Sequence, residues 1–267
     1  MNKKYAIGIV TYHPDVERLK ENIAAASAQP EAGDILIADN DKGDNLGMSG
    51  GLNQICQKAI NLGYEWVVTL DQDSVMQPNT LSEYANYTDI EDIGIICPRI
   101  EDRNMGRQYA LSDKGTEYIS HCITAGNLVR LKAWEAVGGF SEELFIDGVD
   151  FDFCIKLRQN GYKILRTNNV FLLQEVGHGK AISLPFHKQI SIQNHSPLRL
   201  YYIARNYLYI GKKHHQLFHW AIEVAKRMLI VICFEHDKWQ KFRHMILGIY
   251  HFNKGIMGKK DESFPSH

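Results

Sequence analysis

Two aspartates stand one residue apart directly after a strongly apolar run. Asp71 and Asp73 follow the segment WVVTL at 66–70. Carboxylates this close repel one another unless a cation, hydrogen-bond donors or solvent stabilise them. A pair fixed to the end of a rigid strand can bind Mg²⁺ or Mn²⁺, which take oxygen ligands and keep open positions for substrate phosphates. The alternative is that both are ordinary solvated turn residues.

A second acidic cluster leads into a predicted helix. Asp147, Asp150 and Asp152 fall within ELFIDGVDFDFCIKLRQNGY at 143–162. A carboxylate at this place can cap the helix by accepting backbone N–H groups. It can also serve as a general base, which requires an anchored carboxylate that faces the reaction centre. The residues themselves leave both roles open.

A glycine-rich segment offers a different kind of binding element. NLGMSGGLN at 45–53 places Gly47, Gly50 and Gly51 ahead of a predicted helix. Glycine lets a backbone approach a phosphate or a sugar closely, and helix N-termini favour anions. The spacing matches neither GxxxxGK[ST] nor GxGxxG, which argues against a P-loop NTPase and, more weakly, against a dinucleotide enzyme. A purely structural loop is the alternative.

Strands that alternate with helices form the scaffold that must position these residues. We predict strands at 4–12, 34–40, 65–73 and 93–100, helices at 14–28 and 78–88, and a glycine-rich loop that runs into a helix over 45–63. That alternation is typical of a doubly wound, mostly parallel α/β sheet. Ligands bind such sheets at the carboxyl ends of the strands. Five polar residues fall at predicted strand ends, namely Thr11, Asp39, Asn40, Asp71 and Asp73.

The pattern after residue 100 is less regular. Segment 119–140 predicts a strand and then a helix that ends at Gly138-Gly139, and segment 150–164 predicts a helix followed by a strand. Apolar spacing indicates two further helices, at 196–215 and 216–234.

Composition places the chain among ordinary globular proteins. Of its 267 residues 45% are hydrophobic and 23% charged, and its five cysteines are scattered without a CxxC pair. Neither a zinc site nor a disulfide framework is indicated, so a reducing compartment fits best. The first apolar run is too short for a signal peptide, and the longest, MLIVICF at 228–234, is far below the roughly 20 residues that span a bilayer. We therefore expect a cytoplasmic protein, at most peripheral on the inner face of the membrane.

Charge is distributed unevenly along the chain. Residues 1–204 carry a net charge of −7, whereas residues 205–260 carry +8 and six histidines. The basic segment combines an apolar helical face with the cations Lys226, Arg227, Lys238, Lys241 and Arg243. Such a helix can lie on anionic lipid, or it can pack on the core with a solvated basic face. Nucleic acid is disfavoured because no recognised binding motif accompanies the charge.

Taken together, the motifs resemble one enzyme family. VTYHP, ADN, NLGMSGGLN, LDQDS, AGNLVRLKAWEAVGGF and FIDGVDFDFCIKLRQNGY match family 2 glycosyltransferases, which have the GT-A fold, in order and spacing over roughly residues 4–210. The acidic motif followed by NHSPLRLYYIARN more specifically resembles bacterial rhamnosyltransferases of polysaccharide assembly. Those enzymes use dTDP-L-rhamnose and extend a lipid-linked oligosaccharide.

The resemblance implies a division of the chain and a reaction. Residues 1–204 would form the catalytic domain, with a nucleotide half at about 1–100 and an acceptor half at about 101–204. Residues 205–267 would be a basic helical extension. The reaction would be an inverting, metal-dependent transfer of a sugar, rhamnose first, to a hydroxyl of a saccharide or a polyprenyl-diphosphate-linked saccharide. Nucleic acid would not be a partner.

The resemblance also implies roles for individual residues. Asp39 would bind the base, Asp73 the Mn²⁺ or Mg²⁺ that bridges the diphosphate, and Asp150 would deprotonate the acceptor hydroxyl. The nucleotide-sugar pocket would be lined by Thr11, Tyr12, Asp39, Asn40, Asn45, Gly47, Gly51, Asn53, Asp71 and Gly126, with Ala125 and Asn127 near the donor sugar. The residues that contact the acceptor or support the loop would be Asp147, Asp152, His195 and Arg199.

Two departures from the family pattern leave alternatives open. The base motif is often Glu-Asp in relatives and is Val149-Asp150 in this chain. The position that often supplies a metal-binding histidine is Gln174, and His178 lies close enough in sequence to substitute. A UDP-hexose donor, or a degenerate domain that only binds nucleotide, are the rival functions. A nucleotidyltransferase is disfavoured because the glycine-rich segment has no lysine or arginine.

Overall fold

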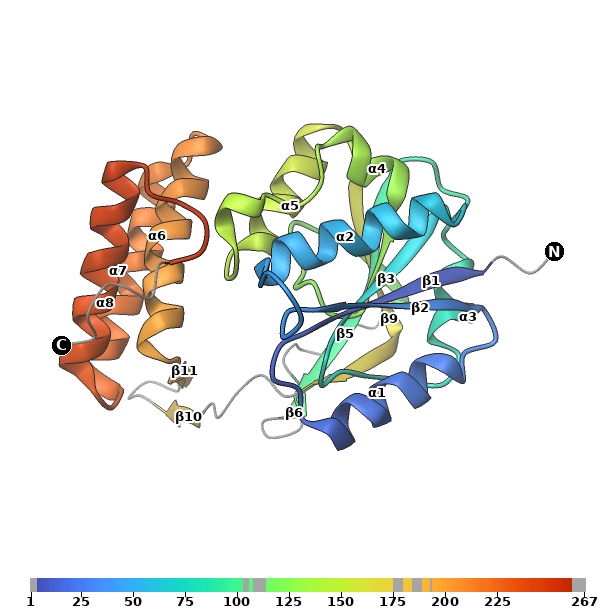
Figure 1. The fold of residues 1–267 in the computed structure, drawn as a ribbon, viewed down its shortest axis with the longest axis horizontal. Helices are drawn as coiled ribbons and strands as arrows, with labels where there is room; N and C mark the ends of the chain where they lie inside the picture. The colour runs from blue at the N-terminus through green and yellow to red at the C-terminus, as the bar shows by residue number, and fades with distance from the viewer. Residues whose placement is uncertain are drawn as a thin grey trace. The chain divides into compact units, whose positions relative to one another are not determined.

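The computed structural model describes residues 4–102, 106–107, 114–174, 180–183, 189–192 and 194–260. The chain divides into two compact units (Figure 1). The first comprises residues 1–140 and 150–176, and the second comprises residues 141–149 and 177–267. His178, a predicted metal ligand, lies outside the described residues.

A mixed sheet forms the centre of the first unit. Among the described residues it has nine strands, seven of them in the order β2-β1-β3-β8-β5-β9-β4. The bounds are β1 Tyr5–Thr11, β2 Ala32–Asp39, β3 Trp66–Asp71, β4 Val75–Met76, β5 Ile93–Asp102, β6 Gly106–Arg107, β7 Thr116–Ile119, β8 Asn127–Arg130 and β9 Lys163–Gln174. Pairing is parallel between β1 and β2, β1 and β3, and β5 and β9. The predicted α/β class with a mostly parallel central sheet is confirmed.

Strand β8 departs from the predicted alternation. It lies between β3 and β5 and runs antiparallel to both. The chain reaches β8 through the segment 119–126, so this segment is brought beside the carboxyl end of β3: the backbone N–H of Gly126 donates to the Thr69 carbonyl at 2.7 Å. Pairing between distant strands is not encoded in local periodicity, which explains why the sequence did not reveal it.

Helices cover both faces of this sheet. Their bounds are α1 Val16–Ser27, α2 Gly47–Asn61, α3 Thr80–Ala85, α4 Leu131–Ala136 and α5 Val149–Gln159. Figure 1 shows α2, α4 and α5 on one face and α1 and α3 on the other. Asp15 begins α1 by accepting the N–H groups of Glu17 and Arg18. Strand β1 is buried along its whole length, which fixes the sheet edge where its last residue, Thr11, stands.

The second unit is a helical bundle. It contains α6 Pro197–Lys213, α7 Leu217–Phe234 and α8 Lys238–Lys254, together with the short hairpin of β10 Lys180–Ser183 and β11 Gln189–Ile192 and the 3₁₀ turn η1 Glu142–Leu144. Leu200, Ala204, Val231 and Met245 belong to its own apolar core. The expected boundary at residue 204 would fall inside α6, whose Leu200, Ala204 and Leu208 share one apolar cluster with Val224, Val231 and Met245. Among the described helices, none has the length and apolar character that crossing a bilayer requires.

Candidate active site

The ends of β1 and β2 form the first part of the site. Thr11 is buried, and its carbonyl accepts the backbone N–H of Asn40 at 2.9 Å. The side-chain amide of Asn40 makes two structural hydrogen bonds: it donates to the Gly47 carbonyl at 3.1 Å and accepts the Leu46 N–H at 2.9 Å. Asn40 therefore holds the start of α2 against the sheet edge.

Asp39, the last residue of β2, is partly exposed, whereas its neighbours Thr11 and Asn40 are buried. It accepts the N–H of Asp41 at 3.0 Å and lies 3.1 Å from the Lys42 ammonium. These groups, Lys42 first, hold the pKa of Asp39 below its usual range. Asp39 is thus anionic at neutral pH and can accept hydrogen bonds from a ligand.

Gln72, which lies between the two aspartates of the DQD motif, joins the end of β3 to the residue that follows β1. Gln72 accepts the Tyr12 N–H at 2.9 Å and donates to the Tyr12 carbonyl at 3.2 Å. The exposed Tyr12 ring is free to meet an aromatic base and lies 4.1 Å, centroid to centroid, from the His13 ring. The His13 N–H in turn donates to Asp41 at 2.7 Å. No sequence signal singled out Gln72 or Asp41.

Asp71 is held from two sides. Its carbonyl accepts the side-chain amide of buried Asn22 at 2.6 Å, and its carboxylate accepts the amide of Gln174 at 2.6 Å. Gln174 is a position at which the motif resemblance led us to consider a metal ligand, and that role stays a prediction. The end of β9 therefore brings that position into direct contact with the motif that ends β3.

The glycine-rich segment differs from the prediction. Helix α2 begins at Gly47, so Gly50, Gly51 and Asn53 are helical residues rather than parts of a loop. Gly47 adopts φ +69°, and its N–H donates to the Asn45 side chain at 2.9 Å. A Cβ on Gly51 would lie 2.9 Å from a Val10 methyl carbon, so this glycine lets α2 pack closely on the sheet.

Asn53 also has a structural task. Its amide donates to the Phe140 carbonyl at 2.9 Å, and its oxygen accepts the Phe140 N–H at 2.8 Å and the Trp134 indole N–H at 3.1 Å. These bonds join α2 to the end of the α4 segment. The nucleotide-binding role predicted for Asn53 stays a prediction.

Gly126 shapes the turn before β8. It adopts φ +80°, and a Cβ at this position would approach Pro98 to 2.9 Å. Its carbonyl accepts the buried Tyr84 hydroxyl at 2.7 Å. The backbone here is fixed on both sides, and the nucleotide-sugar-binding role predicted for Gly126 stays a prediction.

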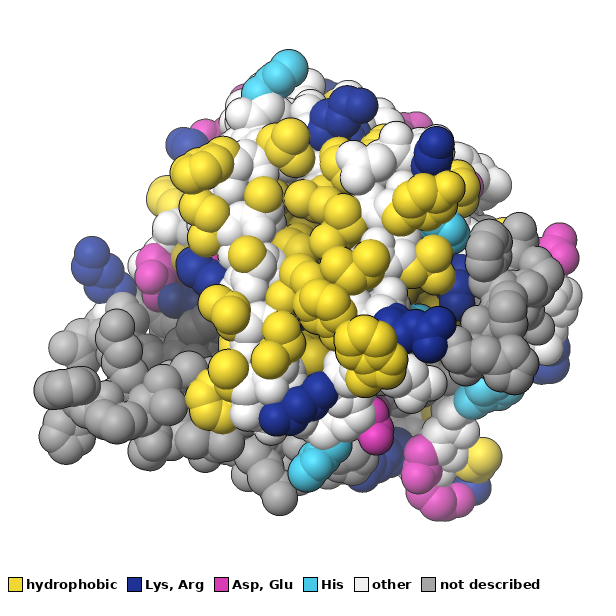
Figure 2. All heavy atoms as spheres, turned by 90° about the vertical axis from the view of Figure 1, so that its left-hand side faces the viewer, with side chains coloured by type: hydrophobic (Ala, Val, Ile, Leu, Met, Phe, Trp, Pro, Cys, Tyr) yellow, Lys and Arg dark blue, Asp and Glu magenta, His cyan; other side chains and the backbone are white. Residues whose placement is uncertain are grey.

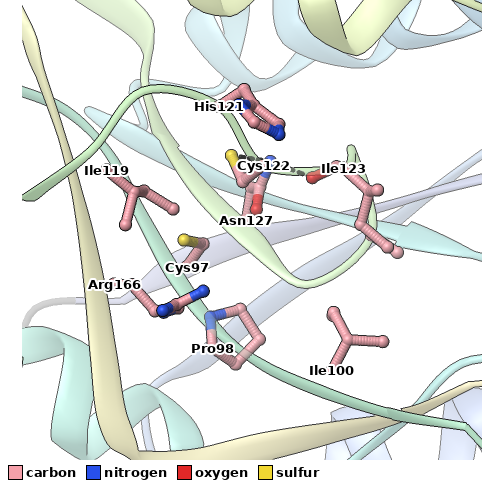
Figure 3. Close-up of a pocket in the computed structure, with 10 residues that line it drawn as sticks. Cys97, Pro98, Ile100, Ile119, His121, Cys122, Ile123, Asn127 and Arg166 are labelled. Carbon is pink, nitrogen blue, oxygen red and sulfur yellow. Dashed lines mark hydrogen bonds between the residues drawn. The ribbon is translucent and has the colours of Figure 1, made fainter. Parts of the chain in front are cut away.

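A pocket opens next to this turn (Figure 3). Its lining residues are Cys97, Pro98, Ile100, Ile119, His121, Cys122, Ile123, Ala125, Asn127 and Arg166. Asn127 donates to the Ile123 carbonyl at 2.6 Å and so holds the 123–127 turn that lines the pocket. Burial, and secondarily the charge of Arg158, lower the pKa of His121, which leaves this imidazole neutral. Ala125 and Asn127, expected near a donor sugar, thus line a real concavity.

Helix α5 carries the candidate base. Asp150 lies in its first turn, where its carboxylate accepts the Phe151 N–H at 2.9 Å. Asp152 is fully buried and pairs with Lys156 at 3.7 Å, while Lys156 also donates to the Gly139 carbonyl. Of the two, Asp150 is the partly exposed carboxylate that could meet an acceptor, and Asp152 supports the helix from within.

The segment that directly precedes Asp150 in the chain is anchored within the second unit. Buried Asn206 donates to three backbone carbonyls, those of Leu144 at 2.9 Å, Ile146 at 2.7 Å and Asp147 at 2.8 Å. Fully buried Arg205 donates to the Leu144 carbonyl at 3.3 Å and to the Gly258 carbonyl at 2.8 Å. Arg205 therefore serves to hold the backbone of this unit together. Two adjacent polar residues inside an apolar helix were the missed signal.

Asp147 and Arg199 form an ion pair in the same unit. The Arg199 Nε lies 3.3 Å from one Asp147 oxygen, and its Nη2 donates to the other. Asp147 adopts φ +60°, so its backbone is locked as well. Roles toward an acceptor stay predictions for both residues.

His195 lies among cations of the second unit. Burial first, and then Arg199, Arg227 and Lys241, lower its pKa to about 3, so the imidazole is neutral at physiological pH. Nearby, buried Glu235 pairs with Lys241 at 2.9 Å and with Arg227 at 3.6 Å. His195 can offer a hydrogen bond to a ligand, but no charge.

The oxygen donors at the sheet edge fit a hard divalent cation. Asp71 and Asp73 supply carboxylates, and Gln174 adds a buried Oε1 that accepts no hydrogen bond from the described residues. Within the described part of the chain, however, no group of three His, Cys, Asp or Glu side chains is close enough to form a metal site alone.

Known structures share this architecture. The S. aureus protein TarS 1-349 in complex with UDP-GlcNAc matches with a TM-score of 0.59 at 13% identity, over 95% of this chain and 81% of that one. GalNAc-T7 with UDP, GalNAc and Mn²⁺ matches with a TM-score of 0.57 at 13% identity, over 79% of this chain and 48% of that one.

The chain has the GT-A glycosyltransferase fold.

Sequence comparison adds a relative of this GT-A chain. The dTDP-rhamnosyl transferase RfbF of Shigella flexneri is 25% identical over 97% of the chain and 98% of its own length. No protein-family model matches the chain. The resemblance drawn from the motifs is thus confirmed by a relative that extends through both units, including the helical bundle.

Proposed function

We propose that this chain is an inverting, divalent-metal-dependent glycosyltransferase that moves L-rhamnose from dTDP-rhamnose to a hydroxyl of a saccharide or a lipid-linked saccharide. The observation that carries the proposal is the nearly full-length likeness to a dTDP-rhamnosyl transferase. The convergence of Asp39, Asp71 and Asp73 on one edge of a GT-A sheet supports it.

The nucleotide would bind at the ends of β1 and β2. Asp39 would accept hydrogen bonds from the thymine ring, and the exposed Tyr12 ring would contact the base. Asp71 would face the ribose, held in place by its bonds from Asn22 and Gln174. Preorganised partners of this kind reduce the cost of ordering on binding.

The ion would be held by Asp73, with His178 or Gln174 as the further protein ligand. When bound, it would neutralise the charge that develops on the departing diphosphate. Asp150 would accept the proton of the acceptor hydroxyl as that oxygen attacks the anomeric carbon. A single displacement inverts the anomeric configuration, so no second carboxylate is needed as a nucleophile.

A thermal-unfolding screen tests the donor. The full chain is heated with dTDP-rhamnose, dTDP-glucose, UDP-glucose, UDP-galactose and UDP-GlcNAc, each with and without Mn²⁺. A ligand at about 100 times its dissociation constant stabilises the folded state by about 2.7 kcal/mol. We expect the largest stabilisation from dTDP-rhamnose with Mn²⁺, and its loss in Asp73→Asn.

Turnover separates the rivals. Consumption of dTDP-rhamnose when a saccharide acceptor is added supports the proposal. Preference for a UDP-hexose would identify a different transferase, which the structural likeness to a UDP-GlcNAc complex makes the second candidate. Binding of nucleotide without turnover on any acceptor would indicate a degenerate domain.

A further inference from the structure

Helix α7 is apolar on two opposite faces. Trp220, Val224 and Val231 are buried within the helical unit. The opposite face follows the spacing i, i+4, i+7, i+11, i+14 and consists of Phe218, Ile222, Ala225, Leu229 and Ile232, all of them exposed. Phe218 is 82% exposed and Leu229 is 62% exposed. A soluble helix usually exposes polar residues opposite its buried face, so an exposed apolar stripe of this length indicates a binding partner.

Helix α8 extends the same apolar surface. Its exposed side chains include Trp239, Ile246 and Tyr250, and Trp239 is 71% exposed. Figure 2, which looks onto the C-terminal helices, shows hydrophobic side chains gathered in one broad field with lysine and arginine around it. We call the residues Phe218, Ile222, Leu229, Ile232, Trp239, Ile246 and Tyr250 the apolar face. Tryptophan and tyrosine suit the boundary between water and an apolar phase, because each has a large ring and one polar group.

The exposed charges around the apolar face are mainly positive. Lys226, Lys238, Arg243 and Lys254 are exposed. Lys226 pairs with Glu223 at 2.7 Å, and Glu235 is buried with Lys241 and Arg227, so these charges largely compensate one another. Of the remaining exposed charges on this helix pair, Asp237 is acidic, whereas Lys238, Arg243 and Lys254 are basic. Arg227 and Lys241, which the sequence suggested for lipid contact, pair with Glu235 inside the bundle instead and are not available to a lipid headgroup.

The positive charge around the apolar face distinguishes between two possible partners, a second copy of the chain and an anionic lipid surface. Two copies joined by a twofold axis would bring the same patch of each together, and so would set these cations against one another. An anionic headgroup layer instead complements the cations while it accepts the apolar side chains. We propose that the apolar face of α7 and α8 lies on an anionic phospholipid surface, with α7 in the plane of the interface rather than across it. This inference does not depend on the proposed transfer reaction.

Vesicle sedimentation with matched leucine variants tests the apolar part. The full chain is mixed with phosphatidylcholine vesicles with and without phosphatidylglycerol, and the bound fraction is measured. We expect Leu229→Gln to weaken binding about tenfold, because a leucine side chain loses its apolar environment. Leu62→Gln is the control, since Leu62, the residue that follows α2 in the other unit, is 56% exposed and the variant should bind as the parent does. Circular dichroism verifies that both variants fold.

Tryptophan fluorescence reports the contact directly. Trp239 is exposed, whereas Trp66, Trp134 and Trp220 are buried. A blue shift of the emission on adding phosphatidylglycerol vesicles is therefore expected from Trp239. Trp239→Phe should abolish the shift and keep most of the sedimentation. A shift that persists in that variant would overturn the proposed orientation.

A pair of charge variants tests the headgroup preference. Lys238→Gln with Arg243→Gln should weaken binding to anionic vesicles about 25-fold, since each basic residue near such a surface contributes a factor of about five. Lys58→Gln with Lys132→Gln removes the same charge from α2 and α4 and should leave binding unchanged. Equal binding to neutral vesicles would overturn the proposal. So would a dimer in sedimentation equilibrium that Leu229→Gln dissociates, because the face would then belong to a second copy.

Discussion

The sheet edge of the first unit and the helical bundle of the second use polar side chains in opposite ways. At the edge, amides such as Asn22, Asn40 and Gln72 hold backbone groups, while Asp39, Asp71 and Asp73 remain partly accessible. In the bundle, Arg205 and Glu235 are buried and bonded, while Phe218 and Trp239 are exposed.

Charged side chains therefore have different tasks in the two units: accessible carboxylates can bind a ligand in the first, and buried charges stabilise the second. Neutral amides can lock a loop without adding charge, so the carboxylates of the sheet edge keep their capacity to bind a cation or a donor group. In the bundle, buried charges fix the segment before Asp150 and the helix ends, and binding is left to apolar surface. On our proposals, the first unit carries the polar chemistry, and the second supports it and attaches to the membrane.

The largest expected effect tests the chemistry of the first unit. Asp150→Asn should lower turnover about 10³-fold, because a general base contributes 10²–10⁴-fold. Donor binding, measured by calorimetry, should stay within about twofold of the parent. Retained transfer by this variant would remove Asp150 from the mechanism and would leave the polar edge without a base.

The anchoring role of the second unit is tested at Asn206. Asn206→Leu removes the amide that donates to three backbone carbonyls, of which that of Leu144 keeps Arg205 as a donor while those of Ile146 and Asp147 lose theirs, and should lower the free energy of unfolding by about 2–4 kcal/mol. Asn160→Leu is the control, since Asn160 is exposed and donates only to the Lys156 carbonyl at 2.9 Å. Denaturant titration measures both. Similar stability of the two variants would show that the buried amide does not anchor the segment.

A pH titration tests the buried cationic cluster. The pKa of His195 is about 3 in the folded chain, against about 6.5 when unfolded. The unfolded state therefore binds the extra proton between these values, and stability should fall as the pH drops below 6.5, by about 2 kcal/mol down to pH 5. His195→Gln should flatten this part of the stability profile. An unchanged slope would place His195 in contact with solvent.

The smallest expected effect concerns the contact between Gln174 and Asp71. Gln174→Leu removes the donor that orients the Asp71 carboxylate, and should weaken Mn²⁺-dependent donor binding about tenfold. Gln57→Leu, at an exposed position of α2, should have no effect. Calorimetry with dTDP and Mn²⁺ measures the two. Equal affinities would mean that Asp71 is positioned by its strand alone.

Much of the fold could be predicted because its signals are local. The apolar runs before Thr11, Asp39 and Asp71 predicted three strands, and the polar residues after them predicted one binding edge. The prediction for the glycine-rich segment was partly wrong, because Gly50 and Gly51 lie within α2 and not in a loop ahead of it. Glycines that favour a loop by composition also allow close helix packing, and only the contact between Gly51 and Val10 shows which of the two applies.

The sequence by itself determined the alternation of strands and helices, the acidic residues at the strand ends, and the excess of positive charge near the C-terminus. Only the tertiary structure decided that β8 inserts antiparallel beside β3, that Gln174 meets Asp71, and that Arg227 and Lys241 pair with buried Glu235 while α7 exposes leucine and phenylalanine. The reason is physical. Periodicity records which side of an element is apolar, whereas the partner of a given side chain depends on segments that are distant in the chain and meet only when it folds.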